Sequence, residues 1–121
     1  MRFSTELYDF DLPDKWNGIV GVKKRGRNAD IVLLWEKGTG RSGLLVSLRC
    51  LKRKASKPDD GKELIRTLTD GDGGTFYLYA VYGREGSVGE ENEDLYWRLR
   101  DRLWQVFESI TTDKRLDKTS V

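Results

Sequence analysis

Histidine is absent from this chain of 121 residues, cysteine occurs once and proline twice. Most nucleophile–base pairs and most transition-metal sites need histidine or several cysteines, so the sequence excludes these chemistries. The lone Cys50 cannot form an intramolecular disulfide, and the fold must therefore depend on packing. We predict no catalytic residue, no metal ligand and no bound cofactor, and we expect a protein that is not an enzyme.

Long apolar runs are also lacking. No stretch reaches the roughly 18 apolar residues needed to cross a bilayer, and the first six residues do not resemble a signal peptide. We expect a cytoplasmic protein as the sequence stands. The alternative is the extracytoplasmic domain of a lipoprotein whose export signal has been removed.

Charge is nearly balanced, with 22 Lys and Arg against 20 Asp and Glu. The halves differ, because residues 1–60 hold 13 basic and 8 acidic residues whereas residues 61–121 hold 9 and 12. With 37% apolar residues, the chain can bury one modest core. We predict a single soluble domain over 1–121, with its core at about 7–111 and a polar, disordered tail at 112–121.

Periodicity predicts mainly strands followed by one helix. Strands are expected at 7–12, 19–22, 31–35 and 44–51, and a hairpin joins 63–69 to 75–82. From Tyr96 to Ile110 an apolar stripe at helical spacing predicts one long helix over 90–110. The segments 31–35 and 75–82 are apolar on both faces, so they should be central. The fold class expected is α+β, an antiparallel sheet of five to six strands.

Two glycine-rich segments are better explained as turns than as ligand-binding loops. Gly38, Gly40 and Gly43 have the spacing of a dinucleotide-binding loop, but a strand pattern follows them instead of the required helix. Asp70 and Asp72 lack the further oxygen ligands of a calcium loop. Both segments are predicted to be turns.

Aromatic side chains provide the leading functional hypothesis. Trp97 and Trp104 lie seven residues apart on the predicted helix and widen its apolar arc beyond one packing surface. Tyr77 and Tyr79 would be semi-exposed if one sheet face were thinly covered. We predict a protein-binding or self-association surface built from Trp97, Trp104, Tyr77 and Tyr79, and the alternative is that these rings simply pack at the rim of the core.

Basic side chains carry the competing hypothesis. They form two clusters: Lys23, Lys24, Arg25 and Arg27, then Arg49, Lys52, Arg53 and Lys54 within the segment 49–57. If the two loops lie on one edge of the sheet, they would contact several phosphates of a nucleic acid. Otherwise they are a solvated loop surface.

The order of several local patterns resembles the PsbP-like superfamily. The matching segments are Phe10 to Gly18, Gly43 to Leu48, Gly74 to Ala80 and Glu90 to Tyr96, which together span about residues 8–111. This superfamily includes a photosystem II extrinsic protein, a Ran-binding nuclear import factor and uncharacterised bacterial proteins. The resemblance implies an α/β/α sandwich, with helices on both faces of the sheet. It implies no catalytic residue and no particular partner.

Overall fold

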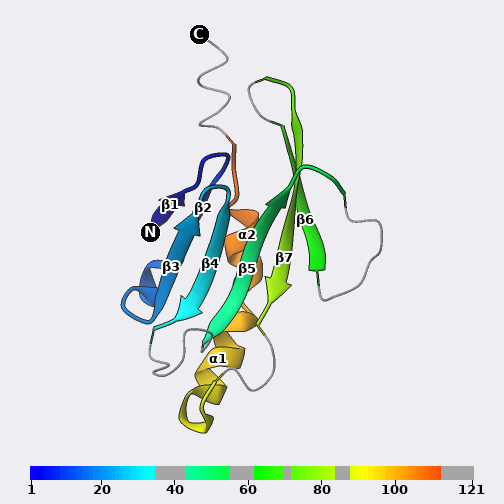
Figure 1. Ribbon diagram of the computed structural model, residues 1–121. Helices are drawn as coiled ribbons and strands as arrows, with labels where there is room; N and C mark the ends of the chain where they lie inside the picture. Colours follow the sequence, from blue (N-terminus) through cyan, green and yellow to red (C-terminus); the bar gives the residue numbers. More distant parts are fainter. Residues whose placement is uncertain (35–42, 55–61, 70–71, 84–87, 113–121) are drawn as a thin grey trace.

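The computed structural model describes residues 1–34, 43–54, 62–69, 72–83 and 88–112 (Figure 1). Within these ranges, seven strands form two antiparallel sheets, one of two strands and one of five in the order β3-β4-β5-β7-β6. The strands are β1 (Arg2–Ser4), β2 (Asp9–Asp11), β3 (Val20–Arg25), β4 (Asn28–Leu33), β5 (Leu44–Leu51), β6 (Lys62–Thr69) and β7 (Thr75–Tyr82). The helical elements are η1 (Asp14–Trp16), η2 (Glu90–Asn92), α1 (Glu93–Arg100) and α2 (Leu103–Glu108).

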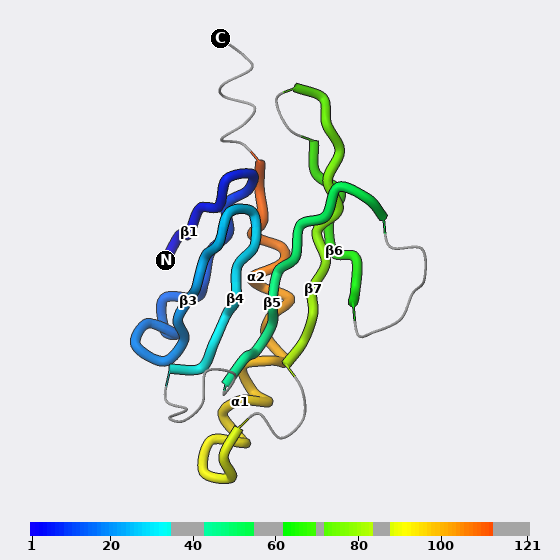
Figure 2. Tube along the Cα trace, viewed as in Figure 1, coloured from blue at the N-terminus to red at the C-terminus, as the bar shows by residue number. Residues whose placement is uncertain are grey.

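The predicted α/β/α sandwich is wrong. Strand accounts for 47% of the described structure and helix for 22%. Behind the five-stranded sheet lie α2 and the β1–β2 hairpin, and α1 extends beyond the end of the sheet at which β5 begins (Figures 1 and 2). We call this covered side the inner face and the opposite side the outer face. Within the described residues, no helix covers the outer face.

The outer face does without a helix because its side chains cover one another across the strands. Tyr79 pairs with Arg49 on one side and Leu64 on the other, and only 4% of its surface is exposed. Next to this group on the same face, Leu51 of β5 is the cross-strand partner of Tyr77 of β7. Long side chains in adjacent strands reach across the strand spacing of about 5 Å. An apolar strand face therefore does not require a helix over it, which is where the sequence interpretation failed.

The core fills the space between the inner face and the helical layer. Its fully buried strand residues include Ile31, Leu48, Leu78 and Ala80, and the helices contribute Tyr96, Leu99, Leu103 and Val106. From the N-terminal hairpin come Tyr8, Phe10 and Leu12. Burying one such apolar side chain contributes roughly 1.5–3 kcal/mol, so this shared layer holds the hairpin, sheet and helices together.

The long helix predicted over 90–110 is divided. A 3-10 turn, η2, precedes α1, and residues 101–102 separate α1 from α2. At this break the Arg102 amide bonds the Leu99 carbonyl at 3.0 Å, three residues back instead of four. Such a tightened turn interrupts the regular helix. The predicted apolar stripe is confirmed, since Tyr96, Leu99, Leu103 and Val106 are all buried.

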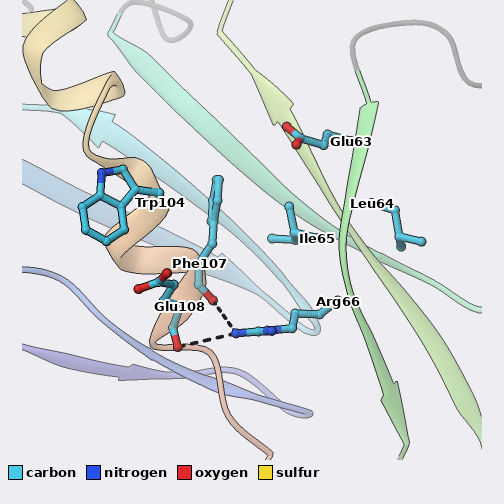
Figure 3. A pocket seen from close by; sticks show the side chains of 7 residues that line it. All are labelled: Glu63, Leu64, Ile65, Arg66, Trp104, Phe107 and Glu108. Atoms are coloured by element: carbon cyan, nitrogen blue, oxygen red, sulfur yellow. Dashed lines mark hydrogen bonds between the residues drawn. The ribbon is translucent and has the colours of Figure 1, made fainter.

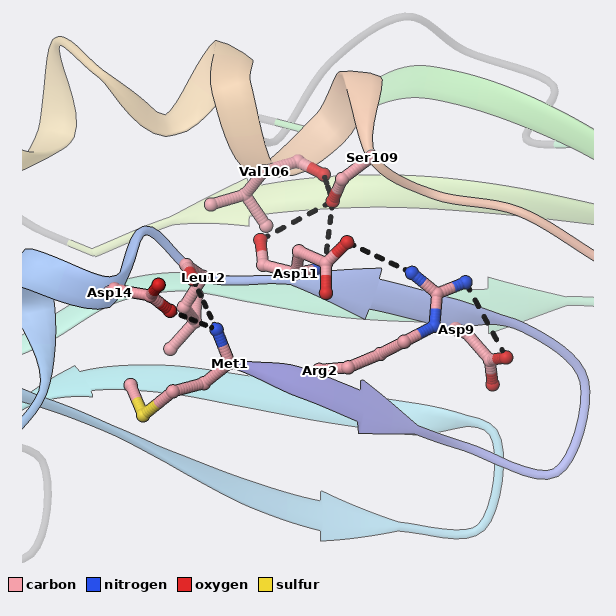
Figure 4. A network of polar contacts seen from close by, with 8 residues as sticks. All are labelled: Met1, Arg2, Asp9, Asp11, Leu12, Asp14, Val106 and Ser109. Atoms are coloured by element: carbon pink, nitrogen blue, oxygen red, sulfur yellow. Dashed lines mark hydrogen bonds and ion pairs between the residues drawn. The ribbon is translucent and has the colours of Figure 1, made fainter.

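Polar contacts fix the end of α2 to the N-terminal hairpin (Figure 4). The Ser109 hydroxyl accepts a bond from the Asp11 amide at 2.8 Å and donates to the Val106 carbonyl at 2.6 Å. Asp9 and Thr111 exchange backbone bonds of 2.8 and 2.9 Å. Arg2 reaches the Asp11 carboxylate at 2.9 Å, closing the hairpin on its exposed side. The C-terminal end of the helical layer is thereby joined to the start of the chain.

Candidate functional site

The four aromatic residues predicted to form one binding surface lie on two. Trp97 and Trp104 belong to the helical layer and are 41% and 54% exposed. Tyr77 and Tyr79 lie on the outer face of β7, where Tyr77 is half-buried and Tyr79 is buried. The sheet separates the two pairs, so no single partner surface contains all four.

Trp97 is occupied by the protein's own arginine. The guanidinium carbon of Arg100 lies 4.7 Å from the centre of the Trp97 ring and 4.9 Å from that of Tyr82. Arg100 also donates a hydrogen bond of 3.0 Å to the Gly83 carbonyl, and Tyr96 packs edge-on against Trp97. Cation–π contacts of this kind are worth roughly 0.5–2 kcal/mol. Trp97 is therefore part of a structural cluster.

Trp104 instead lines an open groove between α2 and β6 (Figure 3). The groove encloses about 300 Å³. Its apolar wall is formed by Trp104, Phe107 and Ile65, and Glu63 and Glu108 lie at its rim. Leu64 also borders it through its backbone, since its side chain points away in Figure 3. The groove joins the helical layer to the last strand of the sheet.

Arg66 and Tyr82 hold the two walls of the groove in position. The Arg66 guanidinium donates to the Phe107 and Glu108 carbonyls at 3.2 and 3.5 Å, at the C-terminal end of α2. Tyr82 packs edge-on against Phe107 and donates from its hydroxyl to Glu63 at 3.1 Å. Burial, then the hydrogen bond and negative charge of Glu63, raise the pKa of Tyr82 to about 12.

A bulge in β6 explains why Ile65 reaches the groove. Leu64 pairs with Tyr79 and Arg66 with Leu78, so Ile65 is an extra residue in β6. At such a bulge two residues of one strand oppose one of the other. The alternation of side chains between the two faces is therefore interrupted at the bulge, and Ile65 and Arg66 both point toward the inner face.

β6 is also an edge strand. It pairs with β7 alone and ends the strand order of the five-stranded sheet. Along its other edge, the described part of the chain supplies no strand. Such an edge offers main-chain donors and acceptors to an added strand. The groove and this edge lie side by side, because Ile65 belongs to both.

The two basic clusters are brought together, as the nucleic-acid hypothesis required. The β3–β4 turn contains Gly26, with φ of +60°, and β4 begins where β5 ends because Ala29 pairs with Leu48. The Asn28 side-chain oxygen accepts a bond of 2.9 Å from the Cys50 amide. All eight predicted side chains lie at this end of the sheet, exposed except for half-buried Arg27.

Other candidates gain nothing from the structure. Gly38, Gly40 and Asp70 lie outside the described residues, whereas Gly43 closes a turn with φ of +78°. Cys50 is buried, and burial raises the pKa of its thiol. Among the described residues, no three His, Cys, Asp or Glu side chains are grouped to hold a metal ion. No helix in the described ranges is long and apolar enough to span a membrane.

No protein-family model matches the chain, and searches of curated proteins and of solved structures returned no match. The resemblance to PsbP-like proteins and the cytoplasmic location therefore stay predictions.

Sequence reasoning found Trp104 but missed the residues that give it a site. Ile65 and Phe107 form the groove with it. Phe107 was assigned to the apolar stripe of the predicted helix, and Ile65 to the predicted strand 63–69, with no role in a site. The non-alternating order Leu64, Ile65, Leu68 in β6 was the available signal, because a regular strand with one apolar face alternates.

Proposed function

We propose that this domain is a non-enzymatic binding module that adds an extended segment of a partner protein to the free edge of β6. The carrying observation is that the β6 edge, which pairs with no second strand among the described residues, coincides with an apolar groove at Trp104, Phe107 and Ile65. Strand addition draws affinity from main-chain hydrogen bonds and specificity from side-chain pockets. The absence of histidine is consistent with binding in place of catalysis.

The groove favours a partner segment of particular chemistry. Successive side chains of an added strand point to opposite faces, so alternate residues would meet the groove. Its wall prefers an apolar or aromatic side chain. Glu63 and Glu108 at the rim are exposed, and they favour lysine or arginine beside that apolar residue. The occupant we commit to is therefore an extended, basic-flanked apolar peptide.

The experiment selects peptides from a library of extended sequences and measures the best by fluorescence anisotropy. Trp104→Ala should weaken binding at least about 30-fold, the effect of losing a central aromatic anchor worth about 2 kcal/mol. Trp97→Ala is the matched control, since it removes the same side chain from the neighbouring helix outside the groove. Amide shifts on binding should concentrate in β6 and α2.

Three results would overturn this proposal. The first is an equal loss of peptide binding in the two tryptophan variants, and the second is that no selected peptide prefers the wild type to Trp104→Ala. The third is a wild-type dimer in sedimentation that Trp104→Ala dissociates. That result would assign the edge to a second copy of this chain, pairing β6 with β6.

A further inference from the structure

We propose that the basic end of the outer face binds single-stranded nucleic acid, at a site separate from the β6 groove and independent of its function. This site consists of Lys23 and Arg25 on β3, Arg49 on β5, and Lys52, Arg53 and Lys54 directly after β5. We call these six side chains the basic end. Each of them is exposed.

Strand register places Lys23, Arg25 and Arg49 on one face, and Lys52, Arg53 and Lys54 follow directly where β5 ends. Lys23 pairs with Asp30 and Arg25 with Asn28 across β3 and β4, and Asp30 pairs with Ser47 on β5. Arg49 lies two residues beyond Ser47, so it shares the outer face with Lys23 and Arg25. Lys24 and Arg27 lie at the same end of the sheet, but each contacts another part of the protein and is not included in the site. The Lys24 ammonium donates to the Ser4 carbonyl at 3.1 Å, and the Arg27 guanidinium covers Phe76 at 4.7 Å.

The Asp30 carboxylate on this face is already engaged in hydrogen bonding within the protein. Asp30 accepts a hydrogen bond of 2.5 Å from the Ser47 hydroxyl, which accepts one of 2.7 Å from Arg49 Nε. These two hydrogen bonds orient the Arg49 side chain through one of its five N–H groups, and the terminal nitrogens carry the other four. Such a fork matches phosphate oxygens. Glu6 approaches the β3–β4 turn at Gly26, and it is a second carboxylate near this end.

An aromatic ring adjoins the cations. Tyr77 pairs with Leu51, the residue just before Lys52, and is half-buried on the outer face. A base stacked on an aromatic ring contributes affinity without sequence preference. Tyr79, the other ring predicted here, is buried and cannot stack.

These features favour a single strand over a duplex or an acidic protein. Stacking on Tyr77 needs an unpaired base, which a duplex does not offer. Acidic peptides would be attracted by the cations but would gain nothing from the ring. Within the described residues the cations lie on strands and a turn, with no basic recognition helix to enter a major groove.

The test measures anisotropy of labelled oligo-dT and oligo-U across a salt series, with a duplex and polyglutamate as competitors. If about four phosphates are neutralised, log K should fall against log salt with a slope of about −3. The triple variant Lys23→Gln, Arg25→Gln, Arg49→Gln should reduce that slope by about 2. Tyr77→Ala should weaken binding about tenfold at any salt concentration.

The control triple variant removes the same charge from the helical side: Lys15→Gln, Arg98→Gln and Arg102→Gln, all exposed. It should keep the wild-type slope, and Trp104→Ala should bind the oligonucleotides normally. The proposal is wrong if the single strand does not bind at low salt, or if the control triple loses as much as the test triple. It is equally wrong if polyglutamate or duplex competes as well as the single strand, or if Tyr77→Ala changes nothing.

Discussion

Replacing Gly83 with alanine should destabilise the protein strongly, although the change adds a single carbon atom. Gly83 is buried at the end of β7, and its amide donates to the Leu45 carbonyl at 3.1 Å. A Cβ at this position would overlap the carbonyl oxygen of Leu44 and lie 2.6 Å from the Tyr96 hydroxyl. That hydroxyl donates to the same Leu44 carbonyl at 2.7 Å. The new methyl group therefore meets backbone on one side and a buried hydrogen bond on the other.

The magnitude follows from these two effects. Overpacking that moves backbone costs about 1–3 kcal/mol. Separating the Tyr96 hydroxyl from its carbonyl leaves buried polar groups unpaired, at about 1–3 kcal/mol. We expect a total of about 3–5 kcal/mol, a large part of the 5–15 kcal/mol that stabilises a typical domain. For a chain of this size, the melting temperature should fall by about 10–20 °C.

The assay is thermal and urea unfolding followed by circular dichroism, with Gly21→Ala as the matched control. A Cβ at Gly21 would lie 2.7 Å from a terminal carbon of Leu34, but that side chain is 52% exposed and can rotate away. Gly21→Ala should therefore change stability by less than about 1 kcal/mol. A Gly83→Ala variant that melts within about 2 °C of the wild type, or an equal loss of stability in the two variants, would contradict this prediction.

Three further outcomes are expected. Tyr96→Phe should cost about 1–2 kcal/mol in urea unfolding, since it leaves the Leu44 carbonyl without the hydroxyl donor, and an unchanged urea midpoint would contradict this. Ser109→Ala should cost about 1 kcal/mol by the same measurement, because the Asp11 amide loses its acceptor; if it equals the wild type, the contact between α2 and the hairpin is unimportant. The pKa of Tyr82 is raised from 10.0 to about 12, so the folded state keeps a proton that the unfolded state loses, and stability should fall as pH rises from about 10 to about 12. Tyr82→Phe should make this decrease in stability shallower when urea midpoints are measured across the same pH range. Some decrease should remain, because burial also raises the pKa of Tyr8. A pH profile identical to that of the wild type would contradict the raised pKa of Tyr82.

Local periodicity predicted most strands, because alternation within one strand is visible in the sequence. The hairpin of β6 and β7 is confirmed, as are the strands at β3, β4 and β5 and the buried stripe of the helices. β1 was missed, since three residues hold no detectable pattern. The second helical layer was predicted wrongly. Apolar residues on two faces of β7 show that both faces are shielded, but not whether a helix or a cross-strand neighbour such as Arg49 shields them.

The candidate sites depend on features that periodicity does not encode. Trp97 and Trp104 have equivalent positions in a regular helix, yet Arg100 covers one and the groove exposes the other. Ile65 reaches that groove only because of the bulge beside it. The basic end needed two segments more than 20 residues apart to meet, and the register between β4 and β5 decides that. A local sequence pattern does not determine how distant strands pair.

The two edges of the five-stranded sheet differ in what they permit in a concentrated solution. β3 carries Lys23, Lys24 and Arg25 in succession, and lysines on an edge oppose its pairing with another strand. Joining β3 of one molecule to β6 of the next would leave free edges at both ends and would grow without limit. Joining β6 to β6 closes after two molecules. The consecutive positive charges of β3 therefore disfavour this open-ended assembly.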